Sequence, residues 1–206
     1  MLYLKKSILF SSSLSIILFF LFSPIIFQLT DYLHPIVLAT VLLCLWAFIT
    51  FIVLLIRKET ISISYTTFLL FLGLYTLSLL VLLFFRPSNQ SYGTYNLIPF
   101  STIYFFLSGK VNLLISFYNL TANVVLFIPY GIFLMIKGCK FSKSEYIYLP
   151  LVSITVVECL QYITRRGSLD IDDLILNLIG VFLGYLLYPV FRRVIIISRE
   201  QKRQVQ

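Results

Sequence analysis

Six long apolar runs decide what this chain can fold into. A helix needs about 20 mostly apolar residues to cross roughly 30 Å of hydrocarbon. The runs that approach or exceed this length are Ser7–Leu29, Pro35–Ile56, Ser64–Phe85, Phe117–Ile136, Glu145–Ile163 and Leu174–Phe191. The chain is 60% hydrophobic and 12% charged, which excludes a soluble domain. We therefore expect an all-α polytopic membrane helix bundle with about six transmembrane helices.

No linker divides these runs, so we expect one membrane domain over residues 1–206. The first run begins like a signal peptide, after Lys5 and Lys6, but it is long and lacks a small-x-small cleavage pattern. We expect it to remain as a membrane helix.

The basic residues indicate the orientation of the bundle. With the N-terminus inside, the cytoplasmic side receives Lys5, Lys6, Arg57, Lys58, Lys137, Lys140, Lys143, Arg192, Arg193, Arg199, Lys202 and Arg203. The outer side receives only Arg86, Lys110, Arg165 and Arg166. This asymmetry follows the positive-inside rule for six spans with both termini cytoplasmic. Residues 192–206 then form a basic cytoplasmic tail, and the net charge of +8 indicates orientation rather than nucleic-acid binding.

Three of the expected helices carry a polar stripe in the half nearest the outer face. At about 100° per residue, side chains three or four positions apart share a helix face. The stripes are Asn112, Ser116, Asn119 and Asn123; Thr155, Glu158, Gln161 and Arg165; and Asp170, Asp173, Asn177, Gly180 and Gly184. The third stripe requires the last helix to extend back through the end of its loop, and Asp172 then points the other way.

A charged side chain at the centre of a membrane helix costs about 2.5–3.5 kcal/mol, so Glu158 needs a partner. Arg165 and Arg166 are the nearest candidates, and Asn123 and Asn177 can serve as hydrogen-bond donors.

We infer that the stripes line an outward-facing polar pocket among the fourth, fifth and sixth helices. The alternative is that they form interhelical contacts that hold the bundle together. Gly180 and Gly184 favour the second interpretation, because small residues four positions apart let helices approach closely. The pocket candidates are Asn96, Asn119, Asn123, Glu158, Gln161, Arg165, Arg166, Asp170, Asp173 and Asn177.

Two proline segments shape the expected pocket. Pro129, with Gly131 just after it, should kink the fourth helix by removing a backbone hydrogen bond. In the long outer connection, Pro99 stiffens the segment "NLIPF", which either covers the mouth of the pocket or forms an ordinary turn. The short apolar piece Ile103–Leu107 is either an interfacial or re-entrant helix, anchored by Tyr92, Tyr95 and Tyr104, or part of an irregular loop.

The sequence contains no phosphate-binding glycine loop and no haem or zinc spacing. Its three cysteines, Cys44, Cys139 and Cys159, are scattered and match no disulfide framework or metal site. We expect no cofactor and no metal ion.

Three segments between Phe85 and Tyr188 stand out by their polar and proline motifs: "FRPSNQSYGTYNLIPF", "NLTANVVLFIPYGIFL" and "VECLQYITRRGSLDIDDLILNLIGVFLGY". Together they resemble the conserved blocks of the VanZ-like family of bacterial membrane proteins. The resemblance implies a VanZ-like core over residues 86–191, preceded by three family-variable helices over residues 1–85. It also implies importance for Asn96, Pro99, Phe100, Asn123, Pro129, Gly131, Glu158, Gln161, Arg166, Gly167, Asp170, Asp173, Asn177 and Gly180.

The resemblance further implies a protein of the bacterial cytoplasmic membrane that lowers susceptibility to glycopeptide antibiotics of the teicoplanin type. Besides the lipid bilayer, its partner would be an envelope lipid, a cell-wall precursor or the glycopeptide itself.

Three mechanisms stay open: a binding or transport module, an intramembrane enzyme that modifies an envelope lipid, and an assembly partner of another envelope protein. The residues favour the first. No nucleophile with an adjacent base is apparent, and the only histidine, His34, lies outside the resembling segments.

Overall fold

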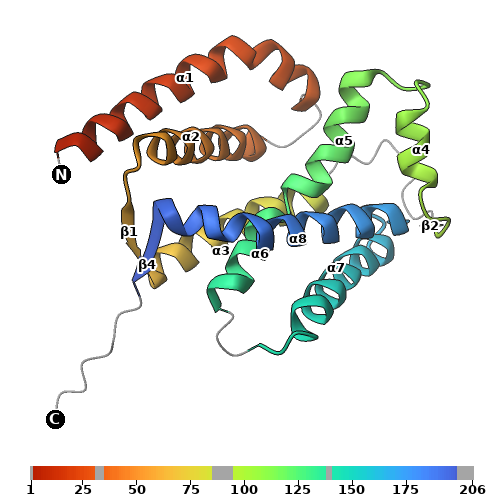
Figure 1. The fold of residues 1–206 in the computed structure, drawn as a ribbon. Coiled ribbons are helices and arrows are strands. Elements are labelled where there is room, and N and C mark those ends of the chain that lie inside the picture. Colours follow the sequence, from red (N-terminus) through yellow and green to blue (C-terminus); the bar gives the residue numbers. More distant parts are fainter. Residues whose placement is uncertain (1, 31–34, 85–94, 138–140, 199–206) are drawn as a thin grey trace. The chain divides into compact units, whose positions relative to one another are not determined.

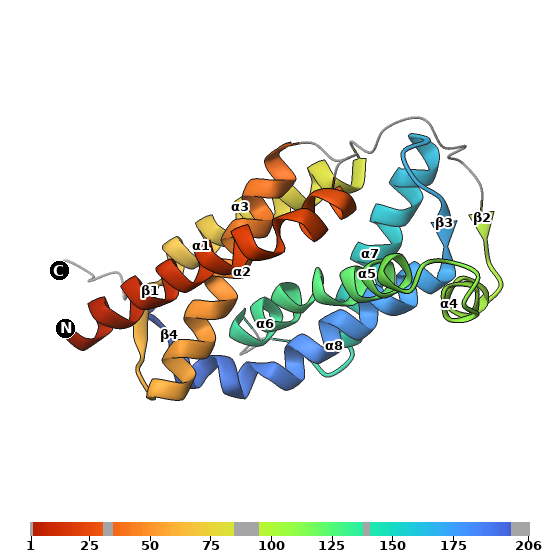
Figure 2. The same ribbon diagram turned by 90° about the horizontal axis from the view of Figure 1, so that it is seen from above.

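The computed structural model describes residues 2–30, 35–84, 95–137 and 141–198, and these are almost entirely helical (Figures 1 and 2). The helices are α1 (Leu2–Thr30), α2 (Pro35–Arg57), α3 (Tyr65–Phe84), α4 (Ser101–Leu107), α5 (Leu113–Val125), α6 (Ile128–Lys137), α7 (Glu145–Ile163) and α8 (Ile171–Val194). The short strands are β1 (Ile61–Ser64), β2 (Tyr95–Asn96), β3 (Leu169–Asp170) and β4 (Ile195–Ser198). The predicted all-α class is confirmed.

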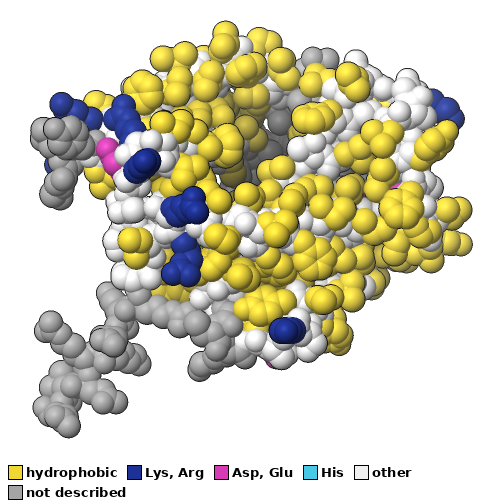
Figure 3. Space-filling model, in the orientation of Figure 1, with side chains coloured by type: hydrophobic (Ala, Val, Ile, Leu, Met, Phe, Trp, Pro, Cys, Tyr) yellow, Lys and Arg dark blue, Asp and Glu magenta, His cyan; other side chains and the backbone are white. Residues whose placement is uncertain are grey.

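Several helical stretches are long and apolar enough to cross a membrane. They are Leu4–Phe27, Tyr65–Phe84, Leu113–Lys137, Glu145–Ile163 and Ile171–Val194. The apolar stretch recorded in α2, Val41–Arg57, is shorter. Hydrophobic side chains cover most of the face shown in Figure 3, which indicates a protein of the lipid bilayer. The number of spans and the cytoplasmic placement of the termini stay predictions.

The chain divides into two compact units. The first unit contains residues 1–82 and 189–206, and the core unit contains residues 83–188. The helix α8 contributes to both, because it belongs to the core unit as far as Tyr188 and to the first unit from Pro189 onward.

In the first unit, small hydroxyl side chains lie where α1 meets α2. Ser7, Ser11 and Ser15, spaced four residues apart, are almost completely buried. Ser11 Oγ lies 2.9 Å from Thr50 Oγ1, and Arg57 donates to Ser7 Oγ at 2.8 Å. Small residues at this spacing let two membrane helices approach closely.

The same unit contains a parallel pair of strands, in which Ile61 of β1 lies opposite Ile195 of β4. This pairing joins the segment that precedes α3 to the segment that follows α8. Phe191, near the end of α8, stacks on Phe51 of α2 with 6.3 Å between ring centroids.

In the core unit, the single helix expected over Phe117–Ile136 is divided into α5 and α6. The break lies at Leu126 and Phe127, just before Pro129, which has no backbone N–H to continue the helical pattern. Phe127 N donates instead to Val124 O at 3.3 Å, a tighter turn than in an α-helix. The kink expected from Pro129 is therefore a break between two helices.

Three glycines allow α8 to pack directly against the backbone of α5 and α6. A Cβ atom added at Gly131 would overlap the carbonyl oxygen of Val181 and lie 2.8 Å from Gly184 Cα. A Cβ atom at Gly180 would overlap the carbonyl oxygen of Val124. Only residues without a side chain fit this contact.

Candidate functional site

A small polar cavity lies within the core unit. It is lined by Leu83, Asn123, Leu126, Phe127, Val157, Glu158, Gln161, Gly167, Ser168, Asp173 and Asn177. The volume within which the centre of a water molecule can lie is about 30 Å³. One water needs roughly 10–15 Å³ of such volume, so the cavity has room for about two waters.

The polar side chains of the cavity come from α5, α7 and α8 and contact one another. Glu158 of α7 is only 4% exposed. Asn177 of α8 donates through Nδ2 to Glu158 Oε1 at 3.4 Å. Asn123 of α5 donates through Nδ2 to Asp173 Oδ1 at 2.5 Å. Two carboxylates and their amide donors thus surround one enclosed space.

Gln161 and Gly167 complete one side of the cavity. Gln161 Nε2 donates to the carbonyl oxygen of Leu83 at 3.2 Å. The side chain of Gln161 passes beside Gly167, where an added Cβ atom would lie 3.1 Å from it. The absence of a side chain at Gly167 therefore leaves room for Gln161 to reach the cavity.

Asp172 does not line the cavity but caps the N-terminus of α4. Its side chain is completely buried. Oδ1 accepts from Phe100 N at 2.5 Å, while Oδ2 accepts from Thr102 N at 2.8 Å and from Ile103 N at 3.2 Å. These N–H groups have no partner inside the helix, and the positive end of the helix dipole favours a carboxylate at this position.

Asp170 lies in β3 rather than on the last helix, which begins one residue later. Its Oδ2 accepts from Thr102 Oγ1 at 2.6 Å, and its Oδ1 accepts from Asp172 N at 2.9 Å. Asn96 of β2 pairs with Asp170 in the parallel register, and its Nδ2 lies 3.4 Å from Asp170 Oδ1. We call this group, Asn96, Thr102, Asp170 and Asp172, the α4 latch.

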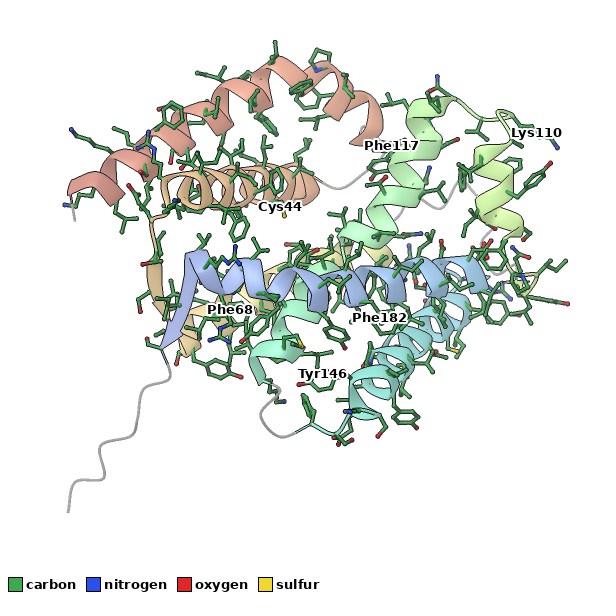
Figure 4. All side chains as sticks on the ribbon, in the orientation of Figure 1. Cys44, Phe68, Lys110, Phe117, Tyr146 and Phe182 are labelled. Atoms are coloured by element: carbon green, nitrogen blue, oxygen red, sulfur yellow. The ribbon has the colours of Figure 1, made fainter. Side chains whose placement is uncertain are left out.

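The apolar piece Ile103–Leu107 is helical, as part of α4, and is not an irregular loop. Just before it, Phe100 has a left-handed backbone with φ 65°. The side chains of Tyr104 and Leu107 are 71% and 70% exposed, and Lys110 lies just beyond the end of the helix (Figure 4). Aromatic, apolar and basic side chains together are typical of a membrane interface. Tyr92, expected to share in this anchor, lies outside the described residues.

In the structure Glu158 contacts Asn177 rather than the arginines that the sequence predicted as its partners. Arg165 follows the end of α7 with φ 53°, which ends the helix. The backbone then folds back, so that Arg166 N and Gly167 N both donate to Gln161 O, at 2.9 and 3.2 Å. Both arginine side chains are exposed, and among the described residues neither pairs with Glu158.

The candidate residues therefore fall into four places. Asn123, Glu158, Gln161, Asp173 and Asn177 line the cavity, Asn96 and Asp170 belong to the α4 latch, Arg165 and Arg166 lie on the exposed turn after α7, and Asn119 bonds to Ile115 O of its own helix. The helical phase correctly placed Asp172 away from the cavity, but its role as the cap of α4 was not predicted. The available signal was an acidic residue in the first turn of α8, which does not identify the backbone groups that the residue binds.

Within the described parts of the chain, no group of three or more His, Cys, Asp or Glu side chains is placed to hold a metal ion. His34 and Cys139 lie outside those parts.

Comparison with known proteins places this site in a family. The sequence model of the VanZ/LLP1 family matches residues 63–192, which is more than half of the chain and contains the cavity and the α4 latch. The chain is 31% identical over 124 residues to protein VanZ of Enterococcus faecium, an alignment that covers 57% of this chain and 70% of that protein. No solved structure matches. With the family match spanning the helices that form the site, the chain belongs to the VanZ/LLP1 family.

Proposed function

We propose that this membrane protein lowers the susceptibility of a bacterium to glycopeptide antibiotics of the teicoplanin type. It acts from the cytoplasmic membrane, where its polar cavity and the neighbouring arginines engage part of an envelope lipid, a cell-wall precursor or the drug. Membership of the VanZ/LLP1 family and the likeness to protein VanZ support this role.

The observation that carries the proposal is the burial of Glu158 in the cavity. An ionisable side chain inside a membrane helix is costly, and at 4% exposure Glu158 is withdrawn from solvent. Asp173 lines the same small space. Two carboxylates on one small cavity carry a desolvation cost that helix packing alone does not require, and we propose that they serve a ligand.

The two exposed arginines extend the site beyond the cavity. Arg165 and Arg166 directly precede Gly167 and Ser168, which line it. Guanidinium groups form bidentate, charge-assisted bonds with phosphate oxygens. The cavity holds only a small group, so we propose that most of the ligand lies outside it, with a phosphate against these arginines.

Expression in a susceptible Gram-positive host tests the proposal. We expect the wild-type protein to reduce both growth inhibition by teicoplanin and surface binding of fluorescent teicoplanin. Glu158→Gln keeps the side-chain shape but removes the charge, and it should lose both effects at equal membrane abundance. Arg166→Lys should impair both, because an ammonium cannot replace bidentate recognition of phosphate.

Glu145→Gln is the matched control, because Glu145 is an exposed residue in the first turn of α7, outside the cavity. It should retain the wild-type effect. Full activity of Glu158→Gln at wild-type abundance would refute the role of the cavity, and no effect of the wild type on teicoplanin susceptibility would refute the function itself.

A further inference from the structure

We propose that residues 95–115 form a lipid-binding surface that lies in one interface of the phospholipid bilayer, where the acyl chains meet the headgroups. We call this segment the α4 hairpin; it contains β2, α4 and the first residues of α5. The proposal concerns the surface that touches lipid and depends neither on the cavity nor on the proposed function.

The small polar side chains around α4 bond within the protein. Asn96 Nδ2 donates to Ser101 Oγ at 2.7 Å and to Thr102 Oγ1 at 2.9 Å. The hydroxyl groups of Ser101 and Ser108 donate to backbone carbonyl oxygens of the hairpin at 2.9 and 2.7 Å. The α4 latch takes up the Thr102 hydroxyl and the N–H groups at the start of α4. These groups therefore need no partner from the surroundings.

The outward side of the same segment is apolar. Every exposed side chain from Tyr95 to Leu107 is apolar or aromatic. The largest, besides Tyr95, are Leu97, Ile98, Phe100, Tyr104, Phe105 and Leu107. Exposed apolar side chains gathered in this way mark contact with a partner or a membrane.

The polar groups that do remain outward match lipid headgroups. Among the described residues, the hydroxyl groups of Tyr95 and Tyr104 have no recorded partner, and Lys110 is exposed and forms no ion pair. Residues 95–115 contain no acidic side chain. Tyrosine combines an apolar body with a polar tip and is enriched where acyl chains end. An ammonium group forms charge-assisted bonds with phosphate oxygens.

The position of the hairpin selects lipid as the occupant. It leads directly into α5 at Leu113, and Asp172 ties α4 to the first turn of α8. Both α5 and α8 belong to stretches long and apolar enough to cross a membrane, so the hairpin lies at the end of two such stretches.

The direction of α4 agrees with that position. In both views α4 runs across the direction of the core-unit part of α8, not along it (Figures 1 and 2). A helix that crosses the end of a membrane-spanning helix in this way lies in the plane of the membrane surface, with its apolar side in the acyl boundary.

Fluorescence quenching of the purified full-length protein in phospholipid nanodiscs tests the proposal. Trp46 is the only tryptophan, so a Trp46→Phe background makes an introduced tryptophan the sole reporter. Tyr104→Trp places this reporter on α4. The quenchers are bromine atoms near the glycerol end of the acyl chains, bromine atoms near their methyl end, and acrylamide dissolved in water.

Phe182→Trp is the matched control reporter. Phe182 is an exposed aromatic residue of α8, roughly 17 Å along the helix from its start and thus close to the bilayer midplane. We expect the Tyr104→Trp reporter to lose more fluorescence with bromine near the glycerol end and the Phe182→Trp reporter to lose more with bromine near the methyl end. Acrylamide should quench the Tyr104→Trp reporter less than it quenches tryptophan in solution.

Phe105→Trp is a second reporter on the same face and should give the same order as Tyr104→Trp. A Tm equal to that of the background protein identifies the reporters that are folded. This second position keeps the test decisive if Tyr104→Trp fails to fold.

Three outcomes would overturn the proposal. Strong quenching by acrylamide without quenching by brominated lipid would place α4 in water. Protection from all three quenchers would show that a second copy or another protein covers the face, and stronger quenching by bromine near the methyl end would show that α4 dips into the bilayer core. The readout involves no antibiotic, so it fails separately from the proposed function.

Discussion

Replacing Asp172 by alanine should release the N-terminus of α4 from α8 while leaving the rest of the core unit folded. The carboxylate accepts from the backbone N–H groups of Phe100, Thr102 and Ile103, at 2.5, 2.8 and 3.2 Å. Among the described residues no other acceptor is found for these three groups, so the alanine variant leaves them to water.

The magnitude follows from the number and type of the lost bonds. Hydrogen bonds to a charged group contribute about 1.5–3 kcal/mol each, and loss of a helix cap costs about 0.5–2 kcal/mol. Because the three donors share one carboxylate and become hydrated when released, we expect about 3 kcal/mol in total, or about a hundredfold change in the local opening equilibrium. Asp172→Asn retains one acceptor oxygen and should cost about half as much.

Amide hydrogen exchange of the protein in nanodiscs measures this opening. The amides of Phe100, Thr102 and Ile103 should exchange about a hundred times faster in Asp172→Ala, with little change in the interior of α7. Thr102→Val is the control, because it removes the hydroxyl bonds to Asp170 and Asn96 and keeps all three amide bonds to Asp172.

Unchanged exchange of these amides in a folded Asp172→Ala protein would refute the capping role. Equal acceleration in Thr102→Val would show that the hydroxyl group of Thr102 contributes as much as the Asp172 carboxylate to holding α4.

Two further predictions concern backbone positions. Gly131→Ala should lower the free energy of unfolding by about 1–3 kcal/mol or more, because its Cβ atom would lie 2.8 Å from Gly184 Cα. Thermal unfolding measures this loss. Gly73→Ala is the control, because nothing lies within 4 Å of the new atom, and it should be neutral or stabilising; equal losses in both variants would contradict the packing argument. Phe100→Asn should slow amide exchange at the start of α4 by several-fold, since a left-handed backbone costs most L-residues roughly 1–2 kcal/mol and asparagine tolerates it better; faster exchange would show that the exposed ring contributes more than the backbone strain costs.

Much of the architecture could be read from periodicity and length. The expected helix Glu145–Ile163 coincides with α7 at both ends, because its apolar run is bounded by polar residues on both sides. The helical phases also indicated that Asn123, Glu158, Gln161, Asp173 and Asn177 share faces, and these residues meet at one cavity. A polar stripe on a membrane helix is favoured to face another polar stripe, because lipid tails offer it no hydrogen-bond partners.

Other features depended on contacts that no local pattern encodes. The sequence placed Asp170 on the last helix and excluded Asp172 from the site, yet Asp170 lies in a strand and Asp172 caps a helix that begins about 70 residues earlier. Helical phase tells which side chains share a face. It does not tell which backbone N–H groups from another element meet the opposite face.

The sequence by itself determined the all-α membrane class, most helix bounds and the polar faces, because burial in lipid requires long apolar helices and concentrates the polar residues. Only the tertiary structure decided the small size of the cavity, the partner of Glu158 and the attachment of α4. Those properties depend on how closely helices approach, here through Gly131, Gly180 and Gly184, and on where Arg165 ends α7 and leaves the arginines exposed.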